Sequence, residues 1–185
     1  PDELVRELGR GGMGAVFLAT RADGEFEHYV ALKLIKRGMD TDFILKRFRN
    51  ERQILAKLSH PNIARLLDGG TSKDGLPYFV MEFVEGEPIH SFCDKRSFTI
   101  HERLQRIQKV CCAVSHAHEK LIIHRDLKPG NILVTDELDL KLLDFGIAKI
   151  LDPEFAGDSL AQTATGMRLM TPEYASPEQI RGEAL

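Results

Sequence analysis

The hydrophobic pattern of this chain changes its period near Gly86, and this change constrains the possible folds more than any other feature. Before Gly86, short apolar runs separated by turn signals are typical of strands. After it, apolar residues recur at steps of three and four, as they do on one face of a helix. The sequence therefore predicts an α+β protein with a strand-rich lobe over residues 1–83 and a helix-rich lobe over residues 84–185.

The first lobe contains apolar runs that we expect to be strands: Leu4–Leu8, Ala15–Ala19, Tyr29–Ile35, Ile63–Leu67 and Leu76–Val84. A turn signal, Lys73-Asp74-Gly75, predicts that the last two runs form a hairpin. Between the third and fourth runs we expect a helix, which Asp40 or Thr41 caps and Pro61 closes.

In the second lobe, Thr99 and Glu102 predict a capping box, because each side chain can accept a hydrogen bond from the other's backbone amide. A single helical face then follows: Ile100, Leu104, Ile107, Cys111, Val114, His118 and Leu121. Two short runs, Ile132–Val134 and Lys141–Leu143, predict a small hairpin under that helix. The stretch Gly146–Met170 is typical of a loop.

Composition disfavours several classes of protein. The formal net charge of -3 argues against a nucleic-acid partner, because such domains carry a clear basic excess. Three cysteines are too few and too poorly spaced for a disulfide framework or a zinc site, which favours a cytoplasmic location. No apolar run approaches transmembrane length, so we expect no membrane contact within this segment. Because the chain begins at Pro1, we expect a piece of a longer protein, which leaves a membrane anchor elsewhere open.

Residues 9–16 read Gly-Arg-Gly-Gly-Met-Gly-Ala-Val, a glycine-rich loop between two expected strands. Glycines let a backbone approach phosphate oxygens and offer its amides without side-chain obstruction. A flexible hairpin turn is the plain alternative. A dinucleotide-binding loop would need a helix at the third glycine, whereas the apolar run from Ala15 to Leu18 continues as a strand.

Lys33 interrupts an apolar strand and shares a strand face with Ala31. In the helix expected next, Glu51 lies on the face formed by Phe48 and Leu55, where an unpaired carboxylate would be costly. We therefore expect an ion pair between Lys33 and Glu51. The alternatives are a lysine that extends from a strand edge and a glutamate at the margin of its face.

Residues 124–131 read His-Arg-Asp-Leu-Lys-Pro-Gly-Asn and form the most specific segment. Asp126 can accept a hydroxyl proton, Lys128 can offset charge on a transferred phosphoryl group, and Asn131 offers a hard oxygen to Mg²⁺. A polar turn ending in Pro-Gly is the alternative, but it leaves this order of side chains unexplained.

Two shorter segments follow. Asp144-Phe145-Gly146 comes directly after an expected strand, where Asp144 can bridge Mg²⁺ to phosphate oxygens; a strand-ending turn is the alternative. Ser176-Pro177-Glu178, with Gln179 three residues after Ser176, is typical of a helix start.

Taken together and in this order, these segments resemble the protein kinase family, and the resemblance covers essentially the whole chain. It implies the bilobal kinase fold, with a five-stranded antiparallel sheet plus one helix in the first lobe and a helical second lobe. It also implies a protein kinase that transfers the γ-phosphate of ATP to a protein hydroxyl with Mg²⁺ as cofactor. Because the family continues through further helices, we expect the second lobe to be incomplete at Leu185 and this fragment to be poorly active.

The resemblance also implies a role for each matched residue. The catalytic set comprises Asp126 as the base, Lys128, Lys33 and Glu51, and the Mg²⁺ ligands are Asn131 and Asp144. The residues expected at ATP are Leu8, Gly9, Arg10, Gly11, Gly12, Met13, Gly14, Ala15, Val16, Ala31, Lys33, Met81, Glu82, Val84 and Leu133. Among them, Met81 resembles the gatekeeper, and the backbone groups of Glu82 and Val84 would bind the adenine edge. A stacked apolar column is expected from His124, Phe145, Leu55 and Leu66.

Two matches imply that the substrates are serine or threonine side chains. Lys128 lies two residues after the base, and Thr171 begins a Thr-Pro-Glu-Tyr segment in which it would contact Asp126 and Lys128. The sequence Gly-Gly-Met-Gly in the glycine-rich loop resembles that of the bacterial branch of the family. Met170 and Ser176 replace the usual glycine and alanine, and we expect slight effects on loop packing.

Arg125, immediately before the base, resembles kinases whose activation loop is ordered by phosphorylation, since an arginine there can bind phosphate. This implies phosphate acceptors in the loop, with Thr163 and Thr165 as the best candidates and Ser159 behind them. Ordinary polar loop residues are the alternative. The resemblance also allows a dimer for autophosphorylation in trans.

Two other functions occur on this kind of fold. A pseudokinase or nucleotide-binding scaffold is disfavoured because the set Lys33, Asp126, Asn131 and Asp144 is intact. A small-molecule phosphotransferase is disfavoured because it would not be expected to keep both Lys128 and the segment 171–178.

Overall fold

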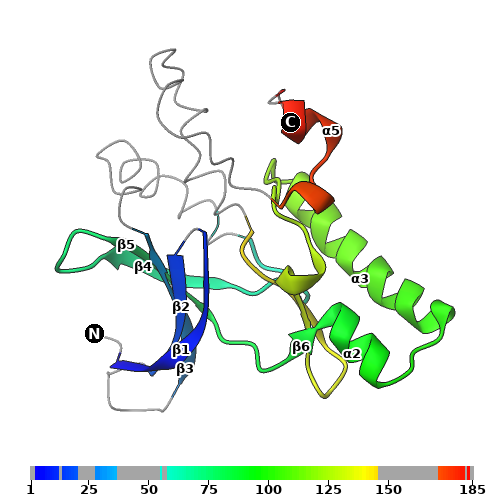
Figure 1. The fold of residues 1–185 in the computed structure, drawn as a ribbon, viewed down its shortest axis with the longest axis horizontal. Coiled ribbons are helices and arrows are strands. Elements are labelled where there is room, and N and C mark those ends of the chain that lie inside the picture. The colour runs from blue at the N-terminus through cyan, green and yellow to red at the C-terminus, as the bar shows by residue number, and fades with distance from the viewer. Residues whose placement is uncertain are drawn as a thin grey trace. The chain divides into compact units, whose positions relative to one another are not determined.

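A computed structural model describes residues 3–12, 14–20, 28–36, 55, 58–145, 171–181 and 183 of the chain. Its contacts divide the chain into two compact units, drawn as a ribbon in Figure 1. The first unit comprises Pro1–Ser59 and Ala64–Val84, and the second comprises His60–Ile63 and Glu85–Leu185. The short segment His60–Ile63 thus packs in the second unit although it lies within the predicted first lobe.

The first unit contains the predicted five-stranded antiparallel sheet, with strand order β1-β2-β3-β5-β4. Its strands are β1 (Glu3–Gly11), β2 (Gly14–Thr20), β3 (Tyr29–Ile35), β4 (Leu66–Thr71) and β5 (Pro77–Glu82). The bounds of β3 are those predicted. The predicted start of β4 at Ile63 is wrong, because Ile63 instead bridges to Leu142 in the second unit.

One cluster of the core of this sheet is aliphatic, and the aromatic Phe79 is fully buried as well. Ala19, Val30 and Val80 are buried together, and Leu32 and Tyr78 pack against them. The predicted hairpin between β4 and β5 is confirmed: Ser72 N donates to Leu76 O at 2.8 Å, and Gly75 has φ +81°, a left-handed conformation that suits glycine. The helix predicted after β3 lies outside the described residues, apart from Leu55 and Leu58, which are both buried.

The second unit combines helices with a three-stranded sheet of order β6-β7-β8. Its elements are β6 (Glu87–Pro88), α2 (Ile89–Lys95), α3 (Ile100–His118), η1 (Pro129–Asn131), β7 (Ile132–Val134), β8 (Leu140–Leu142), η3 (Pro172–Tyr174) and α5 (Pro177–Arg181). The predicted hairpin is confirmed as β7 and β8, with β8 beginning one residue earlier than expected. No described helix combines the length and the hydropathy that a membrane span requires.

Helix α3 is the long green helix of Figure 1, and it begins with the predicted capping box. Glu102 N donates to Thr99 Oγ1 at 3.3 Å, and Thr99 N donates to the Glu102 carboxylate at 2.7 Å. These bonds satisfy backbone amides that a helix start leaves without partners.

The apolar face predicted for α3 is not the one that the described residues bury. The buried residues are Val110, Ala113 and Ala117, on the side that contacts β8. The two alanines allow close approach to the strand. The larger residues of the predicted face remain exposed in the described part of the chain: Ile100 by 79%, Leu104 by 57%, Ile107 by 46% and Leu121 by 87%.

Candidate active site

The polar loop between α3 and β7 is held in place by His124, whose side chain is buried. Its Nδ1 accepts from Asp126 N at 3.3 Å and its Nε2 lies 2.8 Å from Leu143 O. A backbone amide can only donate, so these bonds assign the neutral tautomer with the proton on Nε2. Burial lowers the pKa of His124, although the hydrogen bond to Leu143 partly opposes this effect. The neutral ring therefore ties the loop to the residues that follow β8.

The same histidine also packs on Phe145, with the ring centroids 4.7 Å apart. These two residues belong to the stacked column that the family resemblance implies. Leu55 and Leu66, the other two predicted members, are assigned to the first unit. The contact between His124 and Phe145 is thus the part of that column that the second unit contains.

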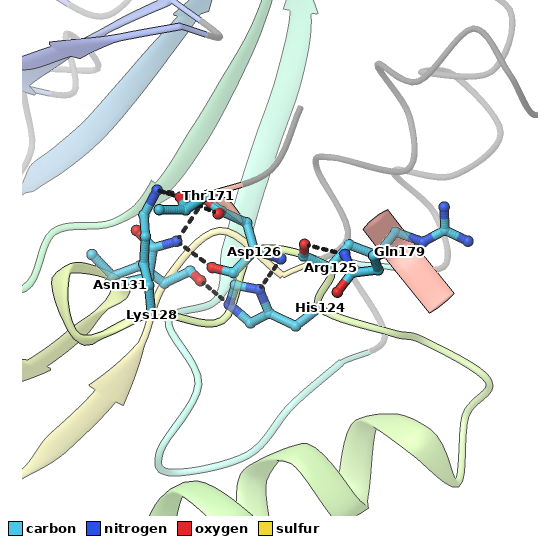
Figure 2. A network of polar contacts seen from close by, with 8 residues as sticks. His124, Arg125, Asp126, Lys128, Asn131, Thr171 and Gln179 are labelled. Carbon is cyan, nitrogen blue, oxygen red and sulfur yellow. Dashed lines mark hydrogen bonds and ion pairs between the residues drawn. The ribbon is translucent and has the colours of Figure 1, made fainter. Parts of the chain in front are cut away.

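Two residues of this region, Arg125 and Asp144, have left-handed backbones, with φ values of +69° and +59°. Such conformations are uncommon for residues other than glycine and occur often at functional sites. The carbonyl of Arg125 accepts a hydrogen bond from Gln179 Nε2 at 2.8 Å (Figure 2). Helix α5 therefore supports the backbone of the loop at the residue next to Asp126.

Asp126 lies at the centre of the polar network in Figure 2, and its side chain is 13% exposed. Its Oδ1 accepts from Thr171 Oγ1 at 2.8 Å, and its Oδ2 lies 2.8 Å from Lys128 Nζ. Lys128 Nζ also donates to Thr171 Oγ1 at 2.8 Å. The predicted contact of Thr171 with both residues is confirmed. The side chains of Asp126, Lys128 and Thr171 therefore all contact one another.

Opposing effects act on the pKa of Asp126. Burial raises it, but the hydrogen bonds from Lys128 and Thr171 and the charge of Lys128 lower it, and the net pKa lies below the ordinary value. The hydrogen bond from Asn131 acts in the same direction. Asp126 is therefore a carboxylate at neutral pH, able to accept a hydrogen bond from a hydroxyl group.

Asn131 is oriented by bonds that use its amide nitrogen. Nδ2 donates to Asp126 O at 2.8 Å and to Asp126 Oδ2 at 3.2 Å, which assigns the other atom of the amide as the oxygen Oδ1. Its carbonyl O accepts from Leu143 N at 2.8 Å, so the loop is bonded to the residue directly before Asp144. Amide and carboxylate oxygens of this kind suit a hard cation.

The described residues contain no cluster of three or more His, Cys, Asp or Glu side chains suited to a metal ion. A cation bound through Asn131 and Asp144 would therefore need further ligands from water or a bound phosphate. Mg²⁺ is usually bound in this way, through one or two carboxylates together with substrate phosphates. The residues present fit that mode of binding.

In the first unit, the glycine-rich loop is the hairpin that joins β1 to β2. Gly14 has φ +144°, and a Cβ there would lie 2.0 Å from Leu34 O, so the packing itself requires glycine. A Cβ on Gly9, Gly11 or Gly12 would meet nothing within 4 Å. The described packing does not require glycine at these three positions, and their predicted role at the ATP phosphates stays a prediction.

Other predicted ATP-binding residues occupy the same hairpin and its neighbours. Ala15 is buried and Leu8 is half-buried, whereas Arg10 is exposed and pairs with Glu7 at 2.7 Å. Met13 lies outside the described residues.

Lys33 is buried in β3, with 5% of its surface exposed. It pairs in register with Val16 of β2 and with Phe79 of β5, while the buried Ala31 pairs with Met81. These residues occupy adjacent strands of one sheet. Glu51 lies outside the described residues, so its ion pair with Lys33 stays a prediction.

The predicted adenine contacts lie at the end of β5 and in β7. Glu82 N donates to Arg65 O at 2.9 Å, and the binding of adenine by the backbone of Glu82 stays a prediction. Val84 ends the first unit. Leu133 lies in the second unit and is half-buried between the buried Ile132 and Val134.

The predicted helix start at Ser176 is confirmed by a reciprocal pair: Gln179 N donates to Ser176 Oγ at 3.3 Å, and Ser176 N donates to Gln179 Oε1 at 3.2 Å. Sequence reasoning missed the second contact of Gln179, with Arg125 O, because no local pattern signals a bond between residues so far apart. Thr163 and Thr165 lie outside the described residues.

The comparisons with known proteins agree with this geometry. The family model described as the protein kinase domain matches residues 3–185. Serine/threonine-protein kinase pkn3 of Myxococcus xanthus is 41% identical over 96% of the chain, and PrkC of Bacillus subtilis is 38% identical over 97%. PknA of Mycobacterium tuberculosis is 38% identical over 97% of the chain. The chain spans 33%, 27% and 41% of the lengths of these three kinases.

Solved structures give the same fold. The crystal structure of the Mycobacterium tuberculosis PknI kinase domain matches with a TM-score of 0.71 and 28% identity, over 100% of this chain and 65% of that one. A double mutant of that domain matches with a TM-score of 0.74, over 100% of this chain and 67% of that one. The protein kinase fold predicted from the sequence is confirmed. The chain belongs to the protein kinase domain family, and the curated relatives that it resembles here are bacterial serine/threonine-protein kinases.

Proposed function

We propose that this chain is the catalytic part of a protein kinase that transfers the γ-phosphate of ATP to serine or threonine hydroxyls of proteins. The observation that carries the proposal is the arrangement of Asp126, Lys128 and Thr171, in which a carboxylate, an ammonium and a hydroxyl meet within 2.8 Å. The names of the relatives support the choice of serine and threonine as acceptors.

The proposed base is Asp126. Its carboxylate stays ionised because its pKa lies below the ordinary value, and it accepts a hydroxyl group already, that of Thr171. A substrate hydroxyl bound in the same way would be oriented toward the phosphoryl group and would pass its proton to Asp126. Lys128, with its ammonium 2.8 Å from that carboxylate, is placed to offset negative charge that develops on the transferred group.

We further propose which residues bind ATP and which bind Mg²⁺. The open glycines Gly9, Gly11 and Gly12 offer backbone amides to the phosphates, Lys33 contacts the α- and β-phosphates, and Asn131 with Asp144 would hold Mg²⁺. When bound, Mg²⁺ would neutralise phosphate charge. Asn131 is well suited to this because its amide nitrogen is already bonded to Asp126, which fixes the side chain.

Asp126→Asn tests the proposal directly. We expect kcat for phosphate transfer to a protein substrate to fall by about 10² to 10⁴, the usual contribution of a positioned base. Asp136→Asn is the matched control, because that carboxylate lies at the surface, with 90% of its side chain exposed. Undiminished turnover by a folded Asp126→Asn enzyme would show that Asp126 is not the base.

Regulation by phosphorylation forms a separate proposal. We propose that Thr163 and Thr165 accept phosphate. A dimer would allow one copy of the kinase to phosphorylate the other. We also propose that the protein acts in the cytoplasm. The sequence supports phosphorylation of these threonines through Arg125, a cation next to the base that can bind a phosphate group. Incubation with ATP followed by mass spectrometry should find phosphate on one of these threonines. A kinase that phosphorylates a substrate while residues 145–177 stay unmodified would contradict this proposal alone.

A further inference from the structure

Two histidines of the second unit lie against each other, outside the residues proposed to act on ATP or substrate. His60 begins the segment 60–63, and His116 lies in the last turn of α3. Their ring centroids are 5.2 Å apart and their planes are inclined by 39°. Both residues are half-buried.

The segment 60–63 is firmly attached to the second unit by backbone and amide bonds. Asn62 Nδ2 donates to Leu140 O at 2.9 Å, and Leu142 N donates to Asn62 O at 2.9 Å. Ile63 is 1% exposed and forms a parallel bridge with Leu142. The chain enters this unit from the first one before residue 60 and returns after residue 63. The segment is therefore the shorter of the two stretches that the second unit comprises.

His60 is neutral in this arrangement, and its protonation would break a bond of the segment. Its Nδ1 accepts from Asn62 N at 3.1 Å, so that nitrogen carries no proton. A proton on Nδ1 would place one donor against another and would put a positive charge beside His116. The buried Nε2 of His116 has no hydrogen-bond partner among the described residues.

The surroundings offer little compensation for a charge on His60. Burial is the main cause that lowers its pKa, and His116 is the one described group whose charge adds to this effect. Within about one turn of His116, the exposed residues Cys112 and His118 lie on α3, and the exposed Glu119 and Lys120 directly follow its end. On β8, Lys141 alternates with the buried Leu140 and Leu142 and so points to the opposite face.

We propose that the pair His60 and His116 makes the attachment of the segment 60–63 to the second unit depend on pH, with the neutral pair attached and a protonated His60 released. The direction of this pH dependence follows from the linkage between proton binding and folding. Because the pKa of His60 is lower in the folded chain, the stabilisation is complete above the unfolded value of about 6.5 and is lost as the pH falls through the lowered folded pKa. This inference does not rest on phosphoryl transfer.

Hydrogen–deuterium exchange of the full-length protein tests this, read on peptides that contain residues 60–63 and 140–142. After correction for the intrinsic pH dependence, exchange there should be faster at about pH 5.5 than at about pH 7.5, by up to about tenfold, because pH 5.5 lies about one unit below the unfolded pKa of about 6.5. His60→Gln should abolish the difference. His118→Gln is the matched control, since His118 is an exposed histidine of the same turn, and should behave as the parent.

A third variant separates the pair from a general effect of acid. His116→Phe keeps an aromatic ring against His60 but removes the second charge, so the pKa of His60 rises toward its ordinary value. The acid-induced increase in exchange should therefore become smaller without vanishing, because burial is the larger cause. Equal protection of the parent at both pH values, an unchanged difference in His60→Gln, or an unchanged difference in His116→Phe would each overturn the inference.

Discussion

The hydroxyl of Thr171 organises two charged groups at once. Its Oγ1 donates to Oδ1 of Asp126 and accepts from Nζ of Lys128, both at 2.8 Å. Charge-assisted bonds of this kind are roughly twice as strong as neutral ones, so one neutral side chain fixes the relative positions of a carboxylate and an ammonium. A fixed position is what a proposed base needs, because small misplacements of reacting groups are costly in rate.

Replacing this hydroxyl should change the pH dependence of the reaction. The hydrogen bond from Thr171 is one of the contacts that hold the pKa of Asp126 below its ordinary value, so Thr171→Ala should raise that pKa. If Asp126 works as a carboxylate, the acidic limb of the kcat/KM profile then moves to higher pH. Thr171→Ser keeps the hydroxyl and should retain the parent profile. An acidic limb that stays in place in Thr171→Ala would rule out this tuning.

At this scale, sequence reasoning predicted which side chains lie together where the contacts are local. The polar side chains of residues 124–131 lie together because they are close in the chain, and their order alone suggested an acid, a cation and a cation ligand. The contact of Thr171 came only through the family resemblance. The bond from Gln179 to Arg125 O was not predicted at all, because only the folded chain brings those atoms together.

Among the elements, α3 shows what a hydrophobic pattern can and cannot predict. The capping residues Thr99 and Glu102 marked its start correctly, because a cap depends on neighbours within one turn. The apolar residues were predicted to share one helical face, and most of that face is exposed among the described residues. The pattern reports which residues are apolar, whereas the face packed on β8 is chosen by the small side chains of Ala113 and Ala117, which allow a close approach.

The hairpin between β1 and β2 provides a matched pair of glycines. Gly14→Ala should destabilise the protein, because the new Cβ would lie 2.0 Å from Leu34 O in a backbone with φ +144°. Gly12→Ala should leave stability unchanged, because its Cβ meets nothing within 4 Å. If the loop covers phosphates, Gly12→Ala should instead raise the KM for ATP.

Thermal melts and ATP-dependent kinetics of both variants measure these two effects separately. A cost of about 1–3 kcal/mol is expected for a strained backbone at Gly14. The interpretation of this hairpin as a phosphate loop would fail if Gly12→Ala bound ATP as the parent does. The steric argument would fail if Gly14→Ala melted at the parent's temperature.

At the scale of the whole molecule, the change of hydrophobic period near Gly86 matches the described elements in part: the five strands of the large sheet precede it, and α2 and α3 follow it together with the short strands β6, β7 and β8. It did not reveal that the segment 60–63 packs in the second unit. Local hydrophobicity cannot show this, because Ile63 continues an apolar run toward Leu67 whichever unit buries it. The partners that decide the matter, Leu140 and Leu142, lie far along the chain.

Ligand binding should stabilise the molecule in a way that depends on Asp144. A ligand that binds only the folded state adds about 2.7 kcal/mol of stability at one hundred times its dissociation constant. We expect ATP with Mg²⁺ to raise the melting temperature more than ATP with a chelator does. Asp144→Asn should lose most of this Mg²⁺-dependent increment, because an amide is a weaker ligand for a hard cation than a carboxylate.

The substitution is chosen so that folding itself is preserved. Asp144 has φ +59°, and asparagine is among the few residues that adopt this conformation readily, so the melting temperature without nucleotide should not change. Asp139→Asn, an exposed carboxylate in the turn before β8, is the matched control and should keep the full increment. If Asp144→Asn kept it as well, Asp144 would not be a ligand. The left-handed backbone there would then need a structural explanation instead.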